Sequence, residues 1–571
     1  MLPRLSGLGA AERDLVREYF LAGLYNIIST LGGRELRLAG RGDEGEAREL
    51  AAAFEEQFGI RLPRGQRSGY GRAVNVAERM FEAVHGDEGG ARFRLVSDAD
   101  GHPGAGPVGI AAMCRTAVDG LGGTVLCGMD IGGTDIKLCL AVDGNLVRLM
   151  EFDWFPAGFT TIDEVIEPID LLVRLLRLDA IRSTDPQAPP DLAGVVEPVM
   201  AGEVALAAIA AAVARGEGLV GEARTGIFDA IGICFPDVVV RDKIVGGEVY
   251  KTRGIRQNPA TDYEAEFRRL SNLDVALRRF VRPGGVVGVI NDGPMAAFTA
   301  AVEMAAADEA SVGRGIFAHT LGTELGTGWV TEAGTIPDIP LEVYNCIIDL
   351  GSHPERAFEP DDVRSVNNFN THLAGTLQKY TSQSGAFRLA MKYLPEASPA
   401  VFAEVLAHGF VVERAEPTGW FVPTEPRDMR KPFLEFLMRL PERGSDPAVE
   451  RIFRELGEFL AVAWLESRWL LAPEAQERIL FGRVVKYREA FALMLEGARL
   501  IVPEVSLVVA DDELANTSLM RQLRDGGTFA VAQFAQAVGA VHYANLRLHQ
   551  ATSQAAADAG SGWVAGVRRA P

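Results

Sequence analysis

The stretch Asp130-Ile131-Gly132-Gly133-Thr134 lies between two short apolar runs, residues 124–129 and 136–142. Both runs are typical of buried β-strands. The two glycines let the backbone bend tightly and approach a ligand without a Cβ in the way. The N–H groups of Gly132 and Gly133, with the Thr134 hydroxyl, are therefore able to hold phosphate oxygens. An ordinary hairpin turn has the same pattern, so the bend alone leaves both interpretations open.

Two charged residues flank this bend. Asp130 ends the first strand, and its carboxylate would repel a phosphate unless a cation stood between them. Mg²⁺ takes few carboxylates and keeps several waters, so we expect Asp130 to hold Mg²⁺ through water. Lys137 is placed to reach the same phosphates. The bend is not a P-loop, because the pattern Gly-x-x-x-x-Gly-Lys-Ser/Thr is missing.

A second bend rich in glycine and threonine, residues 322–328, follows a strand at 315–321 and leads into a strand at 329–331. We expect Gly322 and Thr323 to hold the terminal phosphates of ATP. The order strand, bend, strand thus occurs twice in the chain. This repetition indicates a duplicated α/β domain.

A polar pair, Asn291-Asp292, ends the strand at 286–290 and precedes a helix at 295–307. Phosphoryl transfer to an alcohol needs a group that accepts the hydroxyl proton, and we predict Asp292 for this role. Asp is also a favoured helix cap, so a structural role stays open. The loop with Thr252 and Arg253 is a further candidate for binding hydroxyls, with a solvated surface loop as the alternative.

The bulk composition limits the classes of function. A chain of 571 residues is too long for one core and predicts two to four domains. A net charge of −20 argues against nucleic-acid and anionic-membrane partners. No apolar run reaches the ~20 residues of a membrane span. The five cysteines lack Cys-x-x-Cys spacing, so buried thiols are expected. We expect a cytoplasmic protein.

The pattern along the chain predicts four parts. They are a mostly helical N-terminal extension (1–122), a first lobe (123–290), a second lobe (291–550) with a helical insertion at about 353–470, and a disordered tail (551–571). Gly/Asp-rich turns are expected at 86–90 and 98–106. A single long helix is expected at 192–215, and a strand at 477–485.

Taken together, the motifs resemble those of the ROK (repressor, open reading frame, kinase) sugar kinases, within the sugar kinase and actin-like ATPase superfamily. The matching segments are Asp130–Lys137, Ile231–Asp237, Ile290–Asp292, Leu321–Gly328, Trp469–Val485 and Val538–Val541. They occur in the family's order over about residues 124–550. Thr252-Arg253-Gly254 is also similar to the Thr-Lys-Gly loop of hexokinases.

The resemblance implies an α/β fold with two ribonuclease-H-like lobes around a cleft. It implies an ATP- and Mg²⁺-dependent phosphorylation of a hexose-like sugar, with Asp292 as general base. Asn291 and Glu342 would bind the sugar, together with Thr252 and Arg253, and Gly482 would lie near the adenosine. Closure of the lobes would exclude water, which competes with the sugar hydroxyl.

The chain also departs from the family pattern. The zinc-binding Gly-His…Cys-x-Cys-Gly segment is missing, and Asn345 stands where the family has a histidine, so no zinc is expected. Glu324 replaces a glycine of the second phosphate bend, and Asp237 and Arg483 replace two further glycines. A carboxylate facing the γ-phosphate would oppose binding.

Several alternatives to a sugar kinase therefore stay open. One is a sugar-binding regulator or pseudokinase without phosphoryl transfer, and another is an enzyme with a non-sugar acceptor. A DNA-binding repressor is disfavoured, because residues 1–122 show no basic recognition helix. The sequence does not decide between a monomer and a homodimer.

Overall fold

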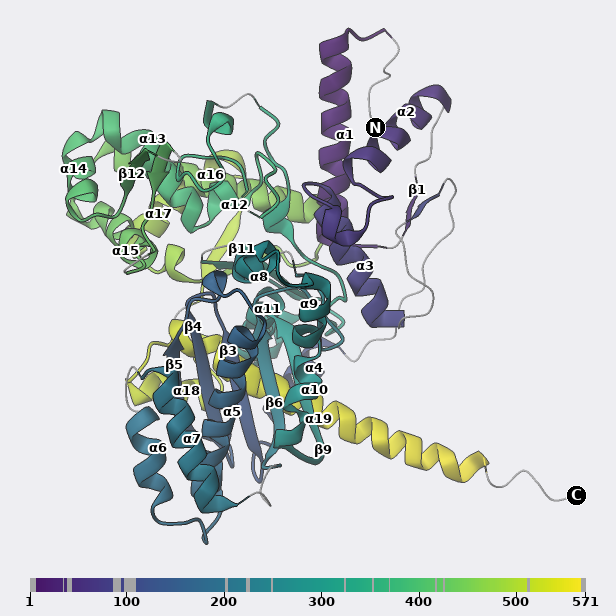
Figure 1. Cartoon of the computed structure of the whole chain (residues 1–571), viewed down its shortest axis with the longest axis vertical. Helices are drawn as coiled ribbons and strands as arrows, with labels where there is room; N and C mark the ends of the chain where they lie inside the picture. The colour runs from purple at the N-terminus through teal and green to yellow at the C-terminus, as the bar shows by residue number, and fades with distance from the viewer. Residues whose placement is uncertain are drawn as a thin grey trace, which may run out of the picture.

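The structure is a computed structural model. It describes residues 7–33, 35–37, 44–85, 94–96, 109–200, 204–221, 226–247, 250–322, 325–351, 354–368, 370–415, 418–424, 427–510 and 514–565. Two sheets with helices on their faces form the body, and the N-terminal helices lie beside it (Figure 1). In the described part of the chain, no helix is long and apolar enough to cross a membrane. All five cysteines are free and buried, as predicted.

The first sheet has five strands. They are β3 (Val125–Ile131), β4 (Asp135–Val142), β5 (Asn145–Asp153), β6 (Phe228–Phe235) and β9 (Val281–Asn291). Their order is β5-β4-β3-β6-β9. The first three form the predicted antiparallel meander, and β6 and β9 run parallel to β3. This order is the one expected of a ribonuclease-H-like lobe, so the predicted fold class is confirmed for this lobe.

Helices cover both faces of the first sheet. The helices α5 (Asp163–Thr184), α6 (Leu192–Met200) and α7 (Leu206–Val220) bury one face. The helices α18 (Ser518–Gly526) and α19 (Val531–Ala565) bury the other. The sequence placed residues 518–550 in the second lobe, and the structure packs them on the first. α19 also packs on α11 (Asp292–Ala307), so it joins the two lobes.

Three glycines on neighbouring strands of the first sheet allow α19 to pack closely against it. Gly128, Gly232 and Gly288 are register partners on β3, β6 and β9. A Cβ at Gly128 would lie 2.2 Å from the Ala537 carbonyl oxygen, and one at Gly232 would lie 1.9 Å from that of Ala540. The helix backbone therefore approaches the strands where side chains are absent.

The second sheet has the order β11-β10-β14-β15. Its strands are β10 (Ile316–Leu321), β11 (Leu325–Val330), β14 (Glu477–Phe481) and β15 (Ser506–Val509). α11 packs on one face, together with α4 (Ile110–Val118). α4 therefore belongs to the body, although the sequence assigned it to the extension.

The predicted helical insertion covers the other face of the second sheet. It contains α12 (Gln378–Thr381), α13 (Gln383–Ala397), α14 (Pro399–Ala407), α15 (Arg430–Arg439) and α16 (Pro447–Leu471), with the hairpin β12 (Val412–Ala415) and β13 (Thr418–Phe421). These helices and α17 (Arg488–Ile501) share one core with Leu321, Leu325 and Leu480 of the sheet. The insertion is thus a layer of the lobe.

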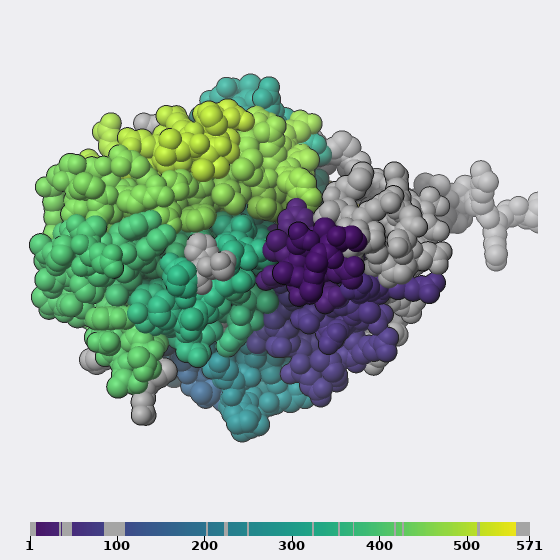
Figure 2. Space-filling model, turned by 90° about the horizontal axis from the view of Figure 1, so that it is seen from above, coloured from purple at the N-terminus to yellow at the C-terminus, as the bar shows by residue number. Residues whose placement is uncertain are grey.

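The N-terminal extension consists of α1 (Ala10–Leu31), α2 (Glu44–Gln57) and α3 (Gly71–His85), with a short parallel pair, β1 (Glu35–Arg37) and β2 (Arg94–Val96). Its apolar core includes Ile347 of the second lobe. Seen from above, the purple and violet surface of the extension adjoins both the green insertion and the teal first lobe (Figure 2). The predicted turns at 86–90 and 98–106 lie outside the described residues.

Three predictions about local structure were wrong. The helix expected at 192–215 is two helices, α6 and α7, and the sequence has Gly202 just after α6, a residue common where helices end. The strand expected at 477–485 ends at Phe481, because Gly482 has φ +104°. Of the tail expected to be disordered at 551–571, residues up to Ala565 continue α19, in keeping with their alanines, and residues 566–571 lie outside the described residues.

Candidate active site

The first Gly/Thr bend is held by a neighbouring aromatic residue. Trp154, just after β5, donates from its indole Nε1 to the Gly132 carbonyl (3.0 Å) and from its backbone N–H to the Thr134 carbonyl (3.1 Å). A Cβ at Gly133 would lie 3.1 Å from Cε of Lys251. The Lys251 side chain therefore passes directly over the bend, which the sequence did not predict.

Asp130 and Lys137 lie side by side below this bend, each only 8% exposed. Burial raises the pKa of Asp130 to about 6, although Lys137 opposes the rise. Lys137 forms an ion pair with Asp135, and Arg483 of the second lobe lies 3.8 Å from the same Asp135 carboxylate. The position where the family has a glycine thus carries a cation that faces the first bend.

The pair Asn291-Asp292 lies at the end of β9, where α11 begins. Asn291 is the N-cap: its side chain accepts from the Gly293 N–H (3.0 Å) and donates to the Asp237 carbonyl (2.6 Å). Asp292 also accepts from the Gly293 N–H (2.8 Å). Burial raises the pKa of Asp292, and Lys251 is the charge that lowers it most. Asn291 has the structural role that the sequence left open for Asp292.

The second Gly/Thr bend packs directly against Asp292. A Cβ at Gly326 would lie 3.3 Å from Asp292 Oδ1, and one at Gly328 would lie 1.9 Å from the Gly293 carbonyl oxygen. The glycines therefore allow the second sheet to contact the start of α11. Thr323 and Glu324 lie outside the described residues, so the predicted roles of both stay predictions.

Gly322 and Gly482 lie together at the other side of this bend. A Cβ at Gly482 would lie 2.4 Å from the carbonyl oxygen of Leu321, the residue before Gly322. The Gly322 carbonyl accepts from the backbone N–H of Gln383 in the helical insertion (3.0 Å). The segment predicted near the adenosine is therefore next to the second Gly/Thr bend.

Three predicted substrate residues are placed apart from this group. The buried Thr252 hydroxyl contacts the Gly247 carbonyl (3.4 Å) and the Tyr263 hydroxyl (3.1 Å). Arg253 makes a bidentate ion pair with Asp361 of the second lobe (2.8 and 2.9 Å). Glu342 accepts from Asn345 (3.0 Å), inside a pocket described below. These contacts give Thr252 and Arg253 structural roles, and their predicted contact with a sugar remains a prediction.

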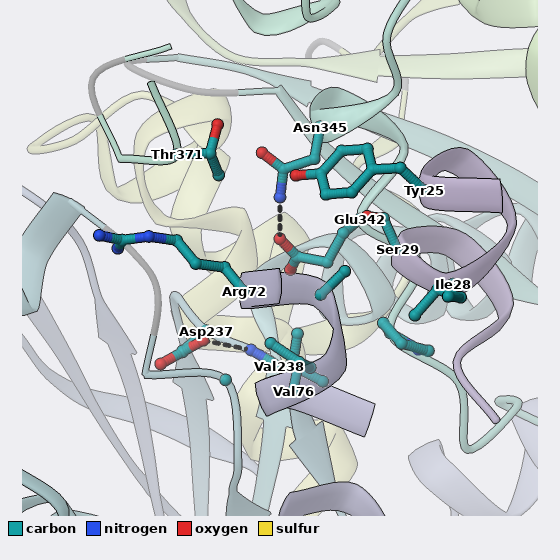
Figure 3. Close-up of a pocket in the computed structure, with 13 residues that line it drawn as sticks. Tyr25, Ile28, Ser29, Arg72, Val76, Asp237, Val238, Glu342, Asn345 and Thr371 are labelled. Carbon is teal, nitrogen blue, oxygen red and sulfur yellow. Dashed lines mark hydrogen bonds between the residues drawn. The ribbon is translucent and has the colours of Figure 1, made fainter. Parts of the chain in front are cut away.

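That pocket lies where the extension meets both lobes (Figure 3). Tyr25, Ser29 and Arg72 line it from the extension, and Asp237, Glu342, Asn345 and Thr371 line it from the body. Asp237 is 1% exposed and accepts from the N–H groups of Val238 and Gly247 (both 2.8 Å). Burial raises its pKa to about 6. Since Asn291 donates to the Asp237 backbone, the pocket adjoins the Asn-Asp pair.

The sequence could have indicated some of the residues that it missed. Lys251 is adjacent to the Thr252-Arg253 segment that we singled out, and Asp237 and Arg483 were noted as departures from a family pattern. Nothing in the sequence indicated Arg72, because only the packing of the extension brings it to the pocket. Among the described residues, no group of three or more His, Cys, Asp and Glu side chains is arranged to hold a metal ion.

Comparison with known proteins gives a likeness at the level of structure. No protein-family model matches the sequence, and no curated protein matches it. Solved structures do match. Several of them are named as ROK-family proteins, and others are named as glucokinases or sugar kinases.

Three of the matching structures, two kinases and a regulator, serve as examples. A ROK family glucokinase from Streptomyces griseus, in complex with glucose and AMPPNP, is 17% identical, with 73% of this chain and 98% of that chain covered and a TM-score of 0.40. A ROK hexokinase from Thermus thermophilus is 17% identical (74% and 99% covered, TM-score 0.36). A ROK family transcriptional regulator, a homologue of the E. coli MLC protein, is 12% identical (74% and 81% covered, TM-score 0.37).

Proposed function

We propose that this protein is an ATP-dependent kinase that phosphorylates a hydroxyl group of a sugar. One observation carries the proposal: Asp292 adjoins the second Gly/Thr bend and is linked to the first by Lys251. Gly326 of the second bend adjoins its carboxylate, and Lys251 both acts on its charge and passes over Gly133 of the first bend. A carboxylate between two phosphate-binding bends is what in-line transfer to an alcohol requires.

The charges of the cleft are suited to Mg-ATP. Asp130, Asp135 and Asp292 lie close enough to influence one another or Lys137, and burial raises the pKa of both Asp130 and Asp292. Carboxylates that are costly to ionise in the protein alone favour a divalent cation. Bound Mg²⁺ would neutralise charge on the phosphates. Asp130 would hold it through water, while Gly132–Thr134, Lys137, Gly322, Thr323 and Gly482 bind the nucleotide.

Asp292 would accept the proton of the sugar hydroxyl. A base works best when its pKa approaches the working pH, and burial moves Asp292 in that direction. Asn291 fixes the backbone at this point through its bonds to Gly293 and Asp237. Lys251, held over the first bend, would attract the phosphoryl group being transferred.

The proposal is tested by incubating the purified protein with Mg-ATP and a panel of hexoses, pentoses and polyols, and by measuring ADP release. We expect release that depends on one or a few of them. Asp292→Asn should lower the rate by about 10²–10⁴-fold. Asp308→Asn, an exposed cap residue beyond the far end of α11, should leave it unchanged.

The outcomes separate the candidate functions. Sugar binding by thermal shift without ADP release from any sugar would contradict the kinase and favour the non-catalytic sugar-binding regulator. Full activity of Asp292→Asn would remove Asp292 from the role of base.

A further inference from the structure

The N-terminal extension supplies one wall of the pocket that contains Glu342 and Asn345. Figure 3 shows Tyr25 and Ser29 of α1 on one side of this pocket, and Arg72 of α3 reaching across it toward the side where Asp237 and Thr371 lie. Glu342 occupies a position where the resemblance expects a sugar-binding residue, and Asn345 is its hydrogen-bond partner. The extension is therefore at the acceptor side of the cleft.

The extension is anchored to the second lobe at the segment that carries Glu342. The last carbonyls of a helix have no partner within the helix. Here the carbonyls of Ser29 and Thr30 accept from the N–H groups of Glu342 (3.1 Å) and Leu341 (3.0 Å). The side chain of Asn26 adds two bonds to the backbone of Ile347 (2.7 and 3.0 Å). The last turn of α1 thus fixes the backbone of Glu342.

The extension is anchored to the first lobe through Arg79 of α3. Its guanidinium donates to the Gly246 carbonyl and to Glu264 (2.6 Å), and it lies over the ring of Phe267 (5.1 Å). Gly246 precedes Gly247, whose N–H binds the Asp237 carboxylate. The extension therefore holds the pocket from both lobes at once.

We propose that the extension completes the acceptor site and that Arg72 is a specificity-determining residue, donating from its guanidinium to an oxygen of a small, uncharged polyhydroxy acceptor. This inference rests on the proposed kinase function. Asp237 and Glu342 supply acceptors, and Arg72, Tyr25, Ser29 and Asn345 supply donors, so the lining matches hydroxyl groups. Two carboxylates against one guanidinium disfavour an acceptor that carries its own negative charge.

The size of the pocket limits the acceptor further. The cavity measures about 20 Å³, which is room for about one water molecule. We therefore expect the acceptor to bind with a shift of α3 away from Asp237. An acceptor that extends beyond a single sugar ring would have to displace α1 and its bonds to Glu342 as well.

The test compares Arg72→Met and Arg72→Lys with wild type in steady-state kinetics on the best acceptor of the panel. We expect Arg72→Met to raise the acceptor KM by about 10- to 100-fold, the loss expected for a charged hydrogen bond, with kcat and the KM for ATP nearly unchanged. The acceptor KM of Arg72→Lys should lie between those of wild type and Arg72→Met, because lysine keeps the positive charge and lacks the planar guanidinium. Arg13→Ala, exposed on α1, is the matched control.

Two further measurements keep the outcomes distinct. The Tm of each variant shows whether it is folded, and Arg72→Lys replaces Arg72→Met if the latter is not. An acceptor KM of both variants within about 2-fold of wild type would overturn the inference and leave the kinase standing. If wild type shows no turnover, the kinase proposal fails. Thermal shifts with the same acceptors then test whether Arg72 binds the acceptor. Acceptor binding by Arg72→Lys and Arg72→Met that equals binding by wild type would overturn the inference.

Discussion

At the scale of single residues, the site is set by carboxylates that the protein makes costly to ionise. Lys251 is the group that most lowers the pKa of Asp292, against the effect of burial. Removing its charge in Lys251→Met should raise that pKa further. Since only the ionised base accepts a proton, the acid limb of the kcat/KM profile should move to higher pH.

The pH profile of Lys251→Met is measured alongside that of Lys243→Met. Lys243 is a lysine of the same lobe that is paired with Asn272 and Asp274, away from the bends. Removing the charge of Lys243 should leave the acid limb of the kcat/KM profile at the same pH as in wild type. An acid limb of Lys251→Met that coincides with wild type would contradict the role of Asp292 as the titrating base.

Asp130 allows a test on stability. Its pKa of about 6 in the fold exceeds the ordinary value of 3.8, so ionised Asp130 destabilises the fold above pH 6 and this cost vanishes below about pH 4. Asp130→Asn should raise the free energy of unfolding by up to about 3 kcal/mol at pH 7.5, and less at pH 5. Denaturant titrations at both pH values check this.

The control for Asp130 is Asp153→Asn, at the exposed end of β5. It should change stability by less than about 0.5 kcal/mol at either pH. Asp130→Asn should also lose kinase activity while gaining stability. A variant that is less stable than wild type at pH 7.5 would show that the carboxylate stabilises the fold.

The sequence predicted those candidate site residues that belong to a short local motif. Glycines and threonines at a strand junction, or an Asn-Asp pair at a strand end, can be recognised as candidate site residues from a few adjacent positions. Arg72, Lys251 and Arg483 do not, because each reaches the site through contacts with residues more than 100 positions away along the chain. The ion pair of Arg253 was not predicted for the same reason, since its partner Asp361 belongs to the other lobe.

At the scale of elements, Arg79 makes the polar contacts that join α3 to the first lobe. Arg79 is 6% exposed and satisfies the Gly246 carbonyl and part of Glu264. Arg79→Met would leave these acceptors without their donor, at a cost of about 2–3 kcal/mol. We expect a lower Tm and faster hydrogen exchange across residues 71–85, with the amides of α5 unchanged.

The matched control is Arg61→Met. Arg61 pairs with Glu55 in the same extension, but on its surface (2.6 Å, side chain 84% exposed), where such pairs contribute about 0–1 kcal/mol. An equal decrease in Tm in Arg79→Met and Arg61→Met would mean that Arg79 does not anchor α3 to the first lobe.

Periodicity predicted most elements, and it failed where the chain changes direction without a strong signal. Residues 192–215 are mostly apolar, so α6 and α7 were read as one helix in spite of Gly202 between them. The strand at 477–485 was extended past Gly482, because only the observed φ of +104° shows the break. The lobe to which α19 belongs depends on packing over hundreds of residues, which no local pattern contains.

At the scale of the whole molecule, the lobes are joined on several sides. Arg253 and Asp361 form an ion pair across them, with side chains 26% and 49% exposed. A charge reversal at either residue, Arg253→Asp or Asp361→Arg, would place like charges together and should increase the radius of gyration at low ionic strength. The double exchange should restore it, with the unfolding free energy within about 1 kcal/mol of wild type.

Small-angle scattering of the four proteins at low and high salt checks this, because salt screens partly exposed charges. The difference between the single variants and wild type should shrink at high salt. A double variant as expanded as the single variants would show that the pair does not hold the lobes.

The glycine row under α19 has a consequence for how the chain acquires its structure. Gly128, Gly232 and Gly288 pack against a helix that is encoded some 250 to 400 positions later in the chain. Until then, one face of the first sheet has no cover, and pairing over such distances along the chain is slow. The nascent protein therefore exposes an apolar face of this sheet until α19 has been synthesised, a period in which chaperones would have to shield it from aggregation.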